Sequence, residues 1–177
     1  MCALVVVESM FGNTRRIAEE VAHGLARGLG ESGQVRVADV SHSPEPLDGV
    51  DLLVVGGPTH AFAMTRMSTR RSAAEQAGAG AQPAQTGLRE WLAALAQAPT
   101  GVRAAAFDTR MDRPRLPGSA AAGAARKLRH LGYDLVARPE TFRVTGTQGP
   151  LLEGELDRAR AWGADVARAA TAATSTA

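Results

Sequence analysis

Short apolar runs alternate along the chain with stretches that have a helical period. Residues 3–7 and 50–57 are almost continuously apolar and rich in valine and leucine. Such runs are typical of strands that are covered on both faces of a parallel sheet. Residues 102–107 form a third run. Alternation over 34–40 and a stretch over 133–144, interrupted by a proline, predict two more strands.

Apolar residues spaced three or four positions apart predict helices between these strands. Ile17, Val21 and Leu25 share one face of a helix over 14–29, with Asn13 or Thr14 as its N-cap. The same spacing predicts three further helices, over 87–95, over 117–131 with Pro117 in the first turn, and over 152–169. Strands and helices therefore alternate, except that a loop over 41–48 joins the second and third strands. This alternation predicts a parallel sheet with helices on both faces.

Two segments lack this pattern. Residues 67–86 consist mainly of small and polar residues with almost no large apolar side chain. We interpret them as a poorly packed or mobile excursion and a candidate lid. Residues 171–177 are expected to form a flexible C-terminal tail. Residues 1–170 then form a single domain, which is long enough to bury a core without disulfides.

The ligand site of such a fold lies beyond the carboxyl ends of the strands. Three loops fall there, at 8–14, 57–66 and 108–116. In the first loop Ser9, Asn13 and Thr14 offer two hydroxyls and an amide at a helix start, where backbone N–H groups favour anions. No lysine follows the glycine as in a nucleoside triphosphate loop, and no GxGxxG pattern is present. A bound monophosphate fits this loop, and an ordinary helix cap is the alternative.

These residues resemble the flavodoxin-like family of FMN proteins. Ser9-Met10-Phe11-Gly12-Asn13-Thr14 is similar to the family's phosphate loop, and residues 56–60 and 107–110 are similar to its two flavin loops. The resemblance implies a three-layer α/β sandwich whose five parallel strands have the order 2-1-3-4-5. It also implies FMN as the cofactor, held by these residues: Ser9, Met10, Phe11, Gly12, Asn13, Thr14, Pro58, Thr59, His60, Ala61, Phe62, Asp108, Thr109, Arg110 and Met111.

The predicted flavin site differs from that of a typical electron-carrying flavodoxin. The two tryptophans, Trp91 and Trp162, lie on predicted helices and are expected in the core, so Phe62, Met64 and Met111 are left as side chains for the flavin ring. Residues 58–130 carry a balance of +7 and the remainder −5, for a net charge of +2. Arginines gather on the predicted site loops: Arg66, Arg70, Arg71, Arg110, Arg113 and Arg115. They predict attraction of an acidic partner protein or an anionic substrate, or they are surface charges.

Several classes of function follow from these features. The leading hypothesis is an FMN-binding redox protein that exchanges electrons with a partner, and a carrier is favoured over a stand-alone enzyme. The alternatives are an FMN-dependent NAD(P)H:quinone oxidoreductase and a flavodoxin-fold module that has lost FMN. His60 is a candidate for a hydrogen bond to the flavin or for protonating a substrate, beside a role in shape alone. No catalytic residue set is predicted.

Composition and residue spacing limit the cellular location and the ligands that the protein is expected to have. A single cysteine, Cys2, and the absence of a signal-peptide pattern predict a cytoplasmic protein. No apolar run reaches the length of a membrane helix. The basic cluster at 126–129 has no interleaved aromatic residues, so a nucleic-acid partner is not expected. The histidines show no metal-ligand spacing.

Overall fold

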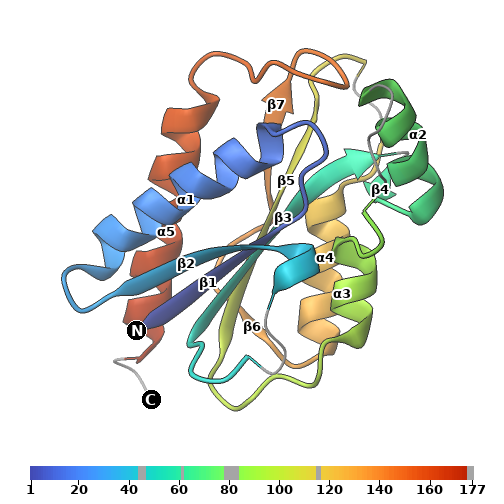
Figure 1. Ribbon diagram of the computed structural model, residues 1–177. Helices are drawn as coiled ribbons and strands as arrows, with labels where there is room; N and C mark the ends of the chain where they lie inside the picture. Colours follow the sequence, from blue (N-terminus) through green and yellow to red (C-terminus); the bar gives the residue numbers. More distant parts are fainter. Residues whose placement is uncertain (44–46, 61, 78–83, 115–116, 175–177) are drawn as a thin grey trace.

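The computed structural model describes residues 1–43, 47–60, 62–77, 84–114 and 117–174. Within these residues the chain forms one twisted sheet flanked by helices (Figure 1). The strands are β1 (Cys2–Val7), β2 (Gln34–Asp39), β3 (Leu52–His60), β4 (Ala63–Met64), β5 (Arg103–Met111), β6 (Asp134–Leu135) and β7 (Glu140–Val144).

The parallel part of the sheet has the order β2-β1-β3-β5, and both β6 and β7 pair with β5 on its free side. The predicted order 2-1-3-4-5 is therefore confirmed, with one refinement. The fifth position is shared by two short strands, because the predicted strand over 133–144 breaks at residues 136–139, around Pro139. Proline has no N–H to donate to a sheet. Strand β4 is an antiparallel addition that pairs with the end of β3.

Helices cover both faces of the sheet, as the pattern predicted (Figure 1). Helices α1 (Asn13–Leu29) and α5 (Glu155–Thr174) pack on one face, and α3 (Leu88–Ala94) and α4 (Ala120–His130) pack on the other. Successive strand residues point to opposite faces. Val5 accordingly packs under α1, and Leu4 packs in the core beneath α3 and α4.

Helices α1 and α5 approach each other closely, and a glycine on α5 makes this possible. A Cβ atom on Gly163 would lie 2.3 Å from the carbonyl oxygen of Val21. Any side chain there would force the helices apart. The close contact fixes α1, and with it the loop from which α1 emerges at the carboxyl end of β1.

The structure corrects four details of the sequence interpretation. Residues 67–77 of the predicted excursion form helix α2 (Met67–Ala77); the rest of it is described only from residue 84. Helix α5 continues to Thr174, so the predicted tail does not begin at residue 171. The hydroxyl of Thr171 donates to the carbonyl of Ala167 and continues the helical bonding. The N-cap of α4 is Ser119, so Pro117 precedes the helix rather than joining its first turn.

The fourth correction concerns the start of α1. Its N-cap is Gly12, with φ 85°, and no side chain of this residue can cap the helix. Asn13 and Thr14 lie inside the first turn. The capping bond comes instead from upstream, because the Ser9 hydroxyl accepts from the amide of Arg15 at 3.2 Å. Asn13 and Thr14 are thus released from capping and are available for other contacts.

Candidate functional site

A cavity opens at the carboxyl end of the sheet, where the three predicted loops meet. It is lined by Met10, Phe11, Asn13, Thr14, Pro58, Thr59, His60, Phe62, Thr109, Arg110, Met111, Pro114, Pro117, Val144 and Thr147. Eleven of the fifteen predicted site residues are in this set. Ser9, Gly12 and Asp108 do not line the cavity, and Ala61 lies outside the described residues. We name this space the first cavity.

The loop from Ser9 to Thr14 forms one end of the first cavity and presents backbone N–H groups. Gly12 adopts a left-handed conformation, which turns the chain into α1. No acceptor for the amides of residues 9–14 is found among the described residues, although the amide of Glu8 just before them donates to Gly56. A row of unpaired amides at a helix start is a receptor for an anion.

Hydroxyl groups join this loop to the strand-five exit. The hydroxyls of Thr14 and Thr109 lie 2.7 Å apart in a buried hydrogen bond. Only one of the two hydroxyls donates in this bond, so the other keeps its own proton for a ligand. On the far side, the Asn13 amide donates to the carbonyl of Gln148 at 2.8 Å. The loop is therefore tied to two neighbouring segments while its backbone amides stay open.

The second loop is a tight hairpin between β3 and β4. His60 pairs with Ala63 across it. Phe62 has φ 73°, a conformation that non-glycine residues rarely adopt, and its side chain is 51% exposed. An exposed aromatic side chain on a strained backbone at a cavity rim is typical of a ligand contact. Met64, by contrast, packs against the core under α4 and does not line the first cavity.

Asp108 holds the walls of the first cavity together without facing into it. Its side chain is fully buried, and one carboxylate oxygen accepts from Thr59 (2.8 Å), Ser119 (2.6 Å) and the amide of Ala121 (2.9 Å). A carboxylate at a helix N-terminus is favoured by the helix dipole. Asp108 therefore fixes the end of β3 against the start of α4.

His60 is a half-buried imidazole on the wall of the first cavity. Burial lowers the pKa of His60 below its ordinary value of 6.5, so the ring is neutral at neutral pH. A neutral imidazole has one N–H donor and one acceptor nitrogen. Neither ring nitrogen has a hydrogen-bond partner in the part of the chain that the structure describes.

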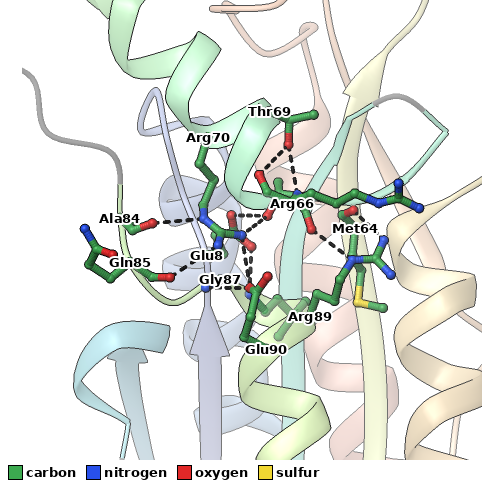
Figure 2. Close-up of polar contacts among 12 residues, drawn as sticks. Glu8, Met64, Arg66, Thr69, Arg70, Ala84, Gln85, Gly87, Arg89 and Glu90 are labelled. Carbon is green, nitrogen blue, oxygen red and sulfur yellow. Dashed lines mark hydrogen bonds and ion pairs between the residues drawn. The ribbon is translucent and has the colours of Figure 1, made fainter.

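A second group of polar contacts begins at Glu8, directly before the phosphate-loop candidate, and we name it the Arg70 cluster: Glu8, Thr65, Arg70, the backbone amide of Leu88, and Glu90. Figure 2 shows Glu8, Arg70 and Glu90 close together. Arg70 of α2 is only 2% exposed. Its guanidinium group donates to Thr65 (3.1 Å) and to the carbonyl groups of Ala84 (3.0 Å) and Gln85 (3.3 Å), and it pairs with Glu90 (3.0 Å).

Glu8 is the other buried charge of the Arg70 cluster. It follows the last residue of β1, and its two oxygens accept from the Thr65 hydroxyl at 2.5 Å and the Leu88 amide at 2.8 Å. Burial raises the pKa of Glu8, and the two hydrogen bonds and the nearby Arg70 charge oppose that effect. The cluster thus joins β1, α2 and α3 through contacts in the interior.

Glu90 completes the cluster at its exposed edge. Partial burial alone would raise the pKa of Glu90, but hydrogen bonds from Arg70 and the Gly87 amide lower it below its ordinary value. Arg89 next to it donates to the carbonyls of Met64 and Thr65. These contacts place α2 over the carboxyl end of the sheet, although its own sequence lacks an apolar face.

The predicted arginine set divides into groups with different surroundings. Arg70 is buried in its cluster and is not available to a partner. Arg110 lines the first cavity and donates to the carbonyl of Gly118 at 2.6 Å. Arg66, Arg71 and Arg113 are exposed, with Arg113 3.6 Å from Asp112. Arg115 lies outside the described residues. The three exposed arginines contribute positive charge to the surface, as the sequence predicted.

Sequence reasoning missed four residues of the first cavity: Pro114, Pro117, Val144 and Thr147. Val144 and Thr147 come from the end of β7 and the loop after it. The carboxyl end of β7 lies at the same edge of the parallel sheet as the three predicted loops. This position could have indicated Val144 and Thr147 as site residues. Pro114 lies in the predicted site loop 108–116 but was not named as a site residue, and nothing in the sequence pattern indicated Pro117.

Of the comparisons with known proteins, the one with solved structures identifies the fold. Neither protein-family models nor curated protein sequences match this sequence. Solved structures do match. A flavodoxin from the domain Archaea has a TM-score of 0.64 at 19% identity, covering 97% of this chain and 99% of that chain. Oxidised flavodoxin 1 from Bacillus cereus has a TM-score of 0.66 at 18% identity, covering 94% and 97%.

A flavodoxin from Streptococcus pneumonia TIGR4 is similar to the same degree, with a TM-score of 0.65 at 19% identity and coverage of 94% of this chain and 98% of that one. The chain has the flavodoxin-like fold. Among the described residues, no helix is both long and apolar enough to cross a membrane.

Proposed function

We propose that this protein binds FMN in the first cavity and transfers electrons to or from a partner. The observation that carries the proposal is the row of unpaired amides at residues 9–14, set at one end of a cavity whose remainder is largely apolar. A ligand with an anionic end and a flat apolar body matches this division. The similarity to solved flavodoxins supports the same assignment.

The donors present suit a phosphate monoester. The amides of Phe11, Gly12 and Asn13 and one hydroxyl of the Thr14–Thr109 pair would hold the phosphate oxygens. Phe62, Met111 and Pro114 offer apolar surface to a ring system. FMN bound there supplies one- and two-electron redox chemistry, and the protein sets its access and potential. Arg110 on the cavity wall would favour a negatively charged reduced cofactor.

Titration with two flavins tests the proposal. The purified protein is added to FMN and, separately, to riboflavin, which has the same ring but no phosphate, and flavin fluorescence is followed. We expect saturable quenching with FMN and binding at least about tenfold weaker with riboflavin, since a phosphate held by several hydrogen bonds is worth more than 1.4 kcal/mol.

Two results would contradict the assignment. If FMN fluorescence does not change at protein concentrations in the tens of micromolar, the fold is present without the cofactor. If riboflavin binds as tightly as FMN, the loop at residues 9–14 is a structural helix start and not a phosphate site. If FMN does bind, a second experiment tests the redox role. The bound flavin is reduced, and its reoxidation by an added electron acceptor is measured.

A further inference from the structure

Residues 145–150 lie in the segment that joins β7 to α5, and we name them the strap. In Figure 1 the orange segment after β7 passes over the carboxyl end of the sheet, above the start of α1. The two ends of the strap are held together, because Val144 pairs with Leu151. Between them the chain makes a compact turn, in which the amide of Gly149 donates to the carbonyl of Gly146 at 3.0 Å.

The strap touches three elements that surround the first cavity. The carbonyl of Gln148 accepts from the side chain of Asn13, in the first turn of α1, at 2.8 Å. The Gln148 side chain donates to the carbonyl of Gln76, near the end of α2, at 3.5 Å. The Thr147 hydroxyl lies 3.7 Å from the sulfur of Met111 at the end of β5, and Thr147 lines the first cavity. The strap therefore crosses the first cavity beside the start of α1.

The contact between the strap and Asn13 is so close that it needs a glycine. Gly149 has φ 100°, and a Cβ atom there would lie 2.5 Å from the side-chain nitrogen of Asn13. No other residue could take this conformation without strain and still lie against Asn13. The backbone amide of Asn13 is one of those proposed to hold the phosphate, so the strap lies directly against the proposed phosphate site.

Little holds the strap in this place. None of its six residues is buried, and none carries a charge. Its bond to Asn13 is short, but its contacts with α2 and β5 are long, at 3.5 and 3.7 Å. An exposed segment with few apolar contacts opens at a low cost in free energy, while the elements at its fixed ends stay folded.

We propose that the strap is a gate at the phosphate end of the first cavity. It lifts away from α1 when an anionic cofactor enters or leaves, and the hydrogen bond between Asn13 and Gln148 holds it closed. This proposal rests on the proposed function, because it assigns a route to the phosphate end of the FMN site. A gate that must open before binding and before release slows both steps. Loosening it therefore raises both rate constants and changes the dissociation constant much less.

Gly149→Ala tests the gate. The added Cβ atom collides with the Asn13 side chain, so the bond between Asn13 and Gln148 is lost whichever of the two moves. Association of FMN is followed by stopped-flow fluorescence, and release is followed after rapid dilution of the complex. We expect both rate constants to rise at least about fivefold while the dissociation constant changes less than about threefold.

Gly146→Ala is the matched control, because it adds the same methyl group to the same strap. Gly146 does not have a positive φ, and a Cβ atom there would come no closer than 3.7 Å to the carbonyl oxygen of Gly149. Both rate constants should stay within about twofold of the wild-type values.

A strapless variant tests the proposal independently of how well Gly149→Ala folds. Residues 145–150 are replaced by Asn-Gly, a two-residue turn that can join paired positions such as Val144 and Leu151. Both rate constants should rise at least as much as in Gly149→Ala. Wild-type rate constants in the strapless variant would overturn the proposal.

The pattern of the two rate constants decides between a gate and a wall. Faster release with unchanged association in Gly149→Ala would mean that the strap only contacts the bound cofactor, and the gate would be rejected. Unchanged values for both rate constants would reject it as well.

Failure of FMN to bind would contradict the proposed function, and the gate is then judged in the FMN-free protein. Nuclear magnetic resonance relaxation dispersion of the strap amides should show exchange on the microsecond to millisecond timescale. The open population should rise in Gly149→Ala and stay unchanged in Gly146→Ala. Flat dispersion profiles in both the wild-type and the Gly149→Ala proteins would overturn the proposal.

Discussion

The Arg70 cluster and the loop at residues 9–14 meet in the sequence at Glu8 and Ser9. They differ in whether their polar groups find hydrogen-bond partners inside the protein. Glu8 belongs to the Arg70 cluster, in which a buried carboxylate and a buried guanidinium are bonded within the protein. Ser9 begins the loop of unpaired amides at the first cavity. Buried polar groups are normally paired, so the cluster needs nothing from outside, and the loop lacks what a ligand can supply.

The difference also concerns charge. The cluster brings charged groups into the interior, where Arg70 pairs with Glu90 and attracts the Glu8 carboxylate, although the two carboxylates repel each other. The cavity loop offers only neutral donors and the partial charges of a helix start. Charges that compensate each other stabilise one arrangement of the chain, whereas neutral donors at a cavity can accept an anion without first breaking an ion pair. We therefore expect substitutions in the two regions to have different consequences.

The largest effect is expected from Arg70→Met. The substitution keeps much of the side-chain volume but removes the bonds to Thr65, Ala84, Gln85 and Glu90. It also leaves the Glu8 carboxylate buried without its compensating charge. Removing one partner of a buried ion pair costs about 3–5 kcal/mol. Urea unfolding followed by circular dichroism should show a loss of this size in the free energy of unfolding.

Arg71→Met is the matched control for that experiment, because Arg71 is the next residue on α2 and is exposed. Its free energy of unfolding should stay within about 0.5 kcal/mol of the wild-type value. Arg70→Lys keeps the charge but loses the forked geometry, and its effect should be intermediate. Equal stabilities for the Arg70→Met and Arg71→Met proteins would show that the cluster does not hold α2.

Substitutions at the two ends of α1 should have a smaller effect on the free energy of unfolding, but they should differ clearly from each other in their effect on FMN binding. Gly12 and Gly30 both have positive φ, 85° and 70°, and a Cβ atom on either would meet nothing within 4 Å. Replacing Gly12, whose ψ of −20° places it in the left-handed helical region, by alanine should lower the free energy of unfolding by about 1 kcal/mol. Gly30, with ψ −167°, lies in a region nearly restricted to glycine, so its replacement should cost about 1–3 kcal/mol, also through backbone strain. Denaturant unfolding measures these losses.

Only Gly12 borders the loop of unpaired amides, so the two variants should differ in ligand binding. Gly12→Ala should weaken FMN binding several-fold with little change in riboflavin binding, and Gly30→Ala should leave both unchanged. Equal FMN affinities for the two variants would remove residues 9–14 from the phosphate site, even if the protein binds flavin elsewhere in the first cavity.

The sequence predicted the fold well because the fold depends on signals that are local. The apolar runs of β1, β3 and β5 and the helical spacing of Ile17, Val21 and Leu25 specify strands and helices without reference to the rest of the chain. Helix α2 was missed because it has no apolar face of its own. Its position comes from Arg70, a charged residue whose partners Ala84, Gln85 and Glu90 lie beyond the end of α2 in the sequence.

The site was predicted in outline for a similar reason. The carboxyl ends of parallel strands meet at one edge, so most of the site residues named from the three loops do line the first cavity. The direction in which each side chain points was not accessible. Asp108 faces the start of α4 and Ser9 caps α1, although each has a neighbour in the cavity. Local spacing does not contain this information, because it depends on the packing of α1 and α4.

The smallest expected effect concerns His60 and the pH dependence of stability. Burial holds the pKa of His60 below its ordinary value of 6.5 in the folded protein. As the pH falls below about 6.5, the unfolded chain binds a proton at this position before the folded chain does. The folded state should therefore lose stability on acidification. The loss specific to His60 should be under about 1 kcal/mol between pH 7 and pH 5.5.

Comparing wild type with His60→Gln isolates that contribution, since glutamine does not titrate. Urea unfolding at several pH values should show the wild-type free energy of unfolding falling relative to the variant as the pH decreases. His42→Gln, at an exposed position, should run parallel to wild type. A wild-type protein that gains stability relative to His60→Gln on acidification would mean that His60 has an acidic partner inside the fold. His60 would then belong with the internally paired groups of the Arg70 cluster and not with the open donors of the cavity.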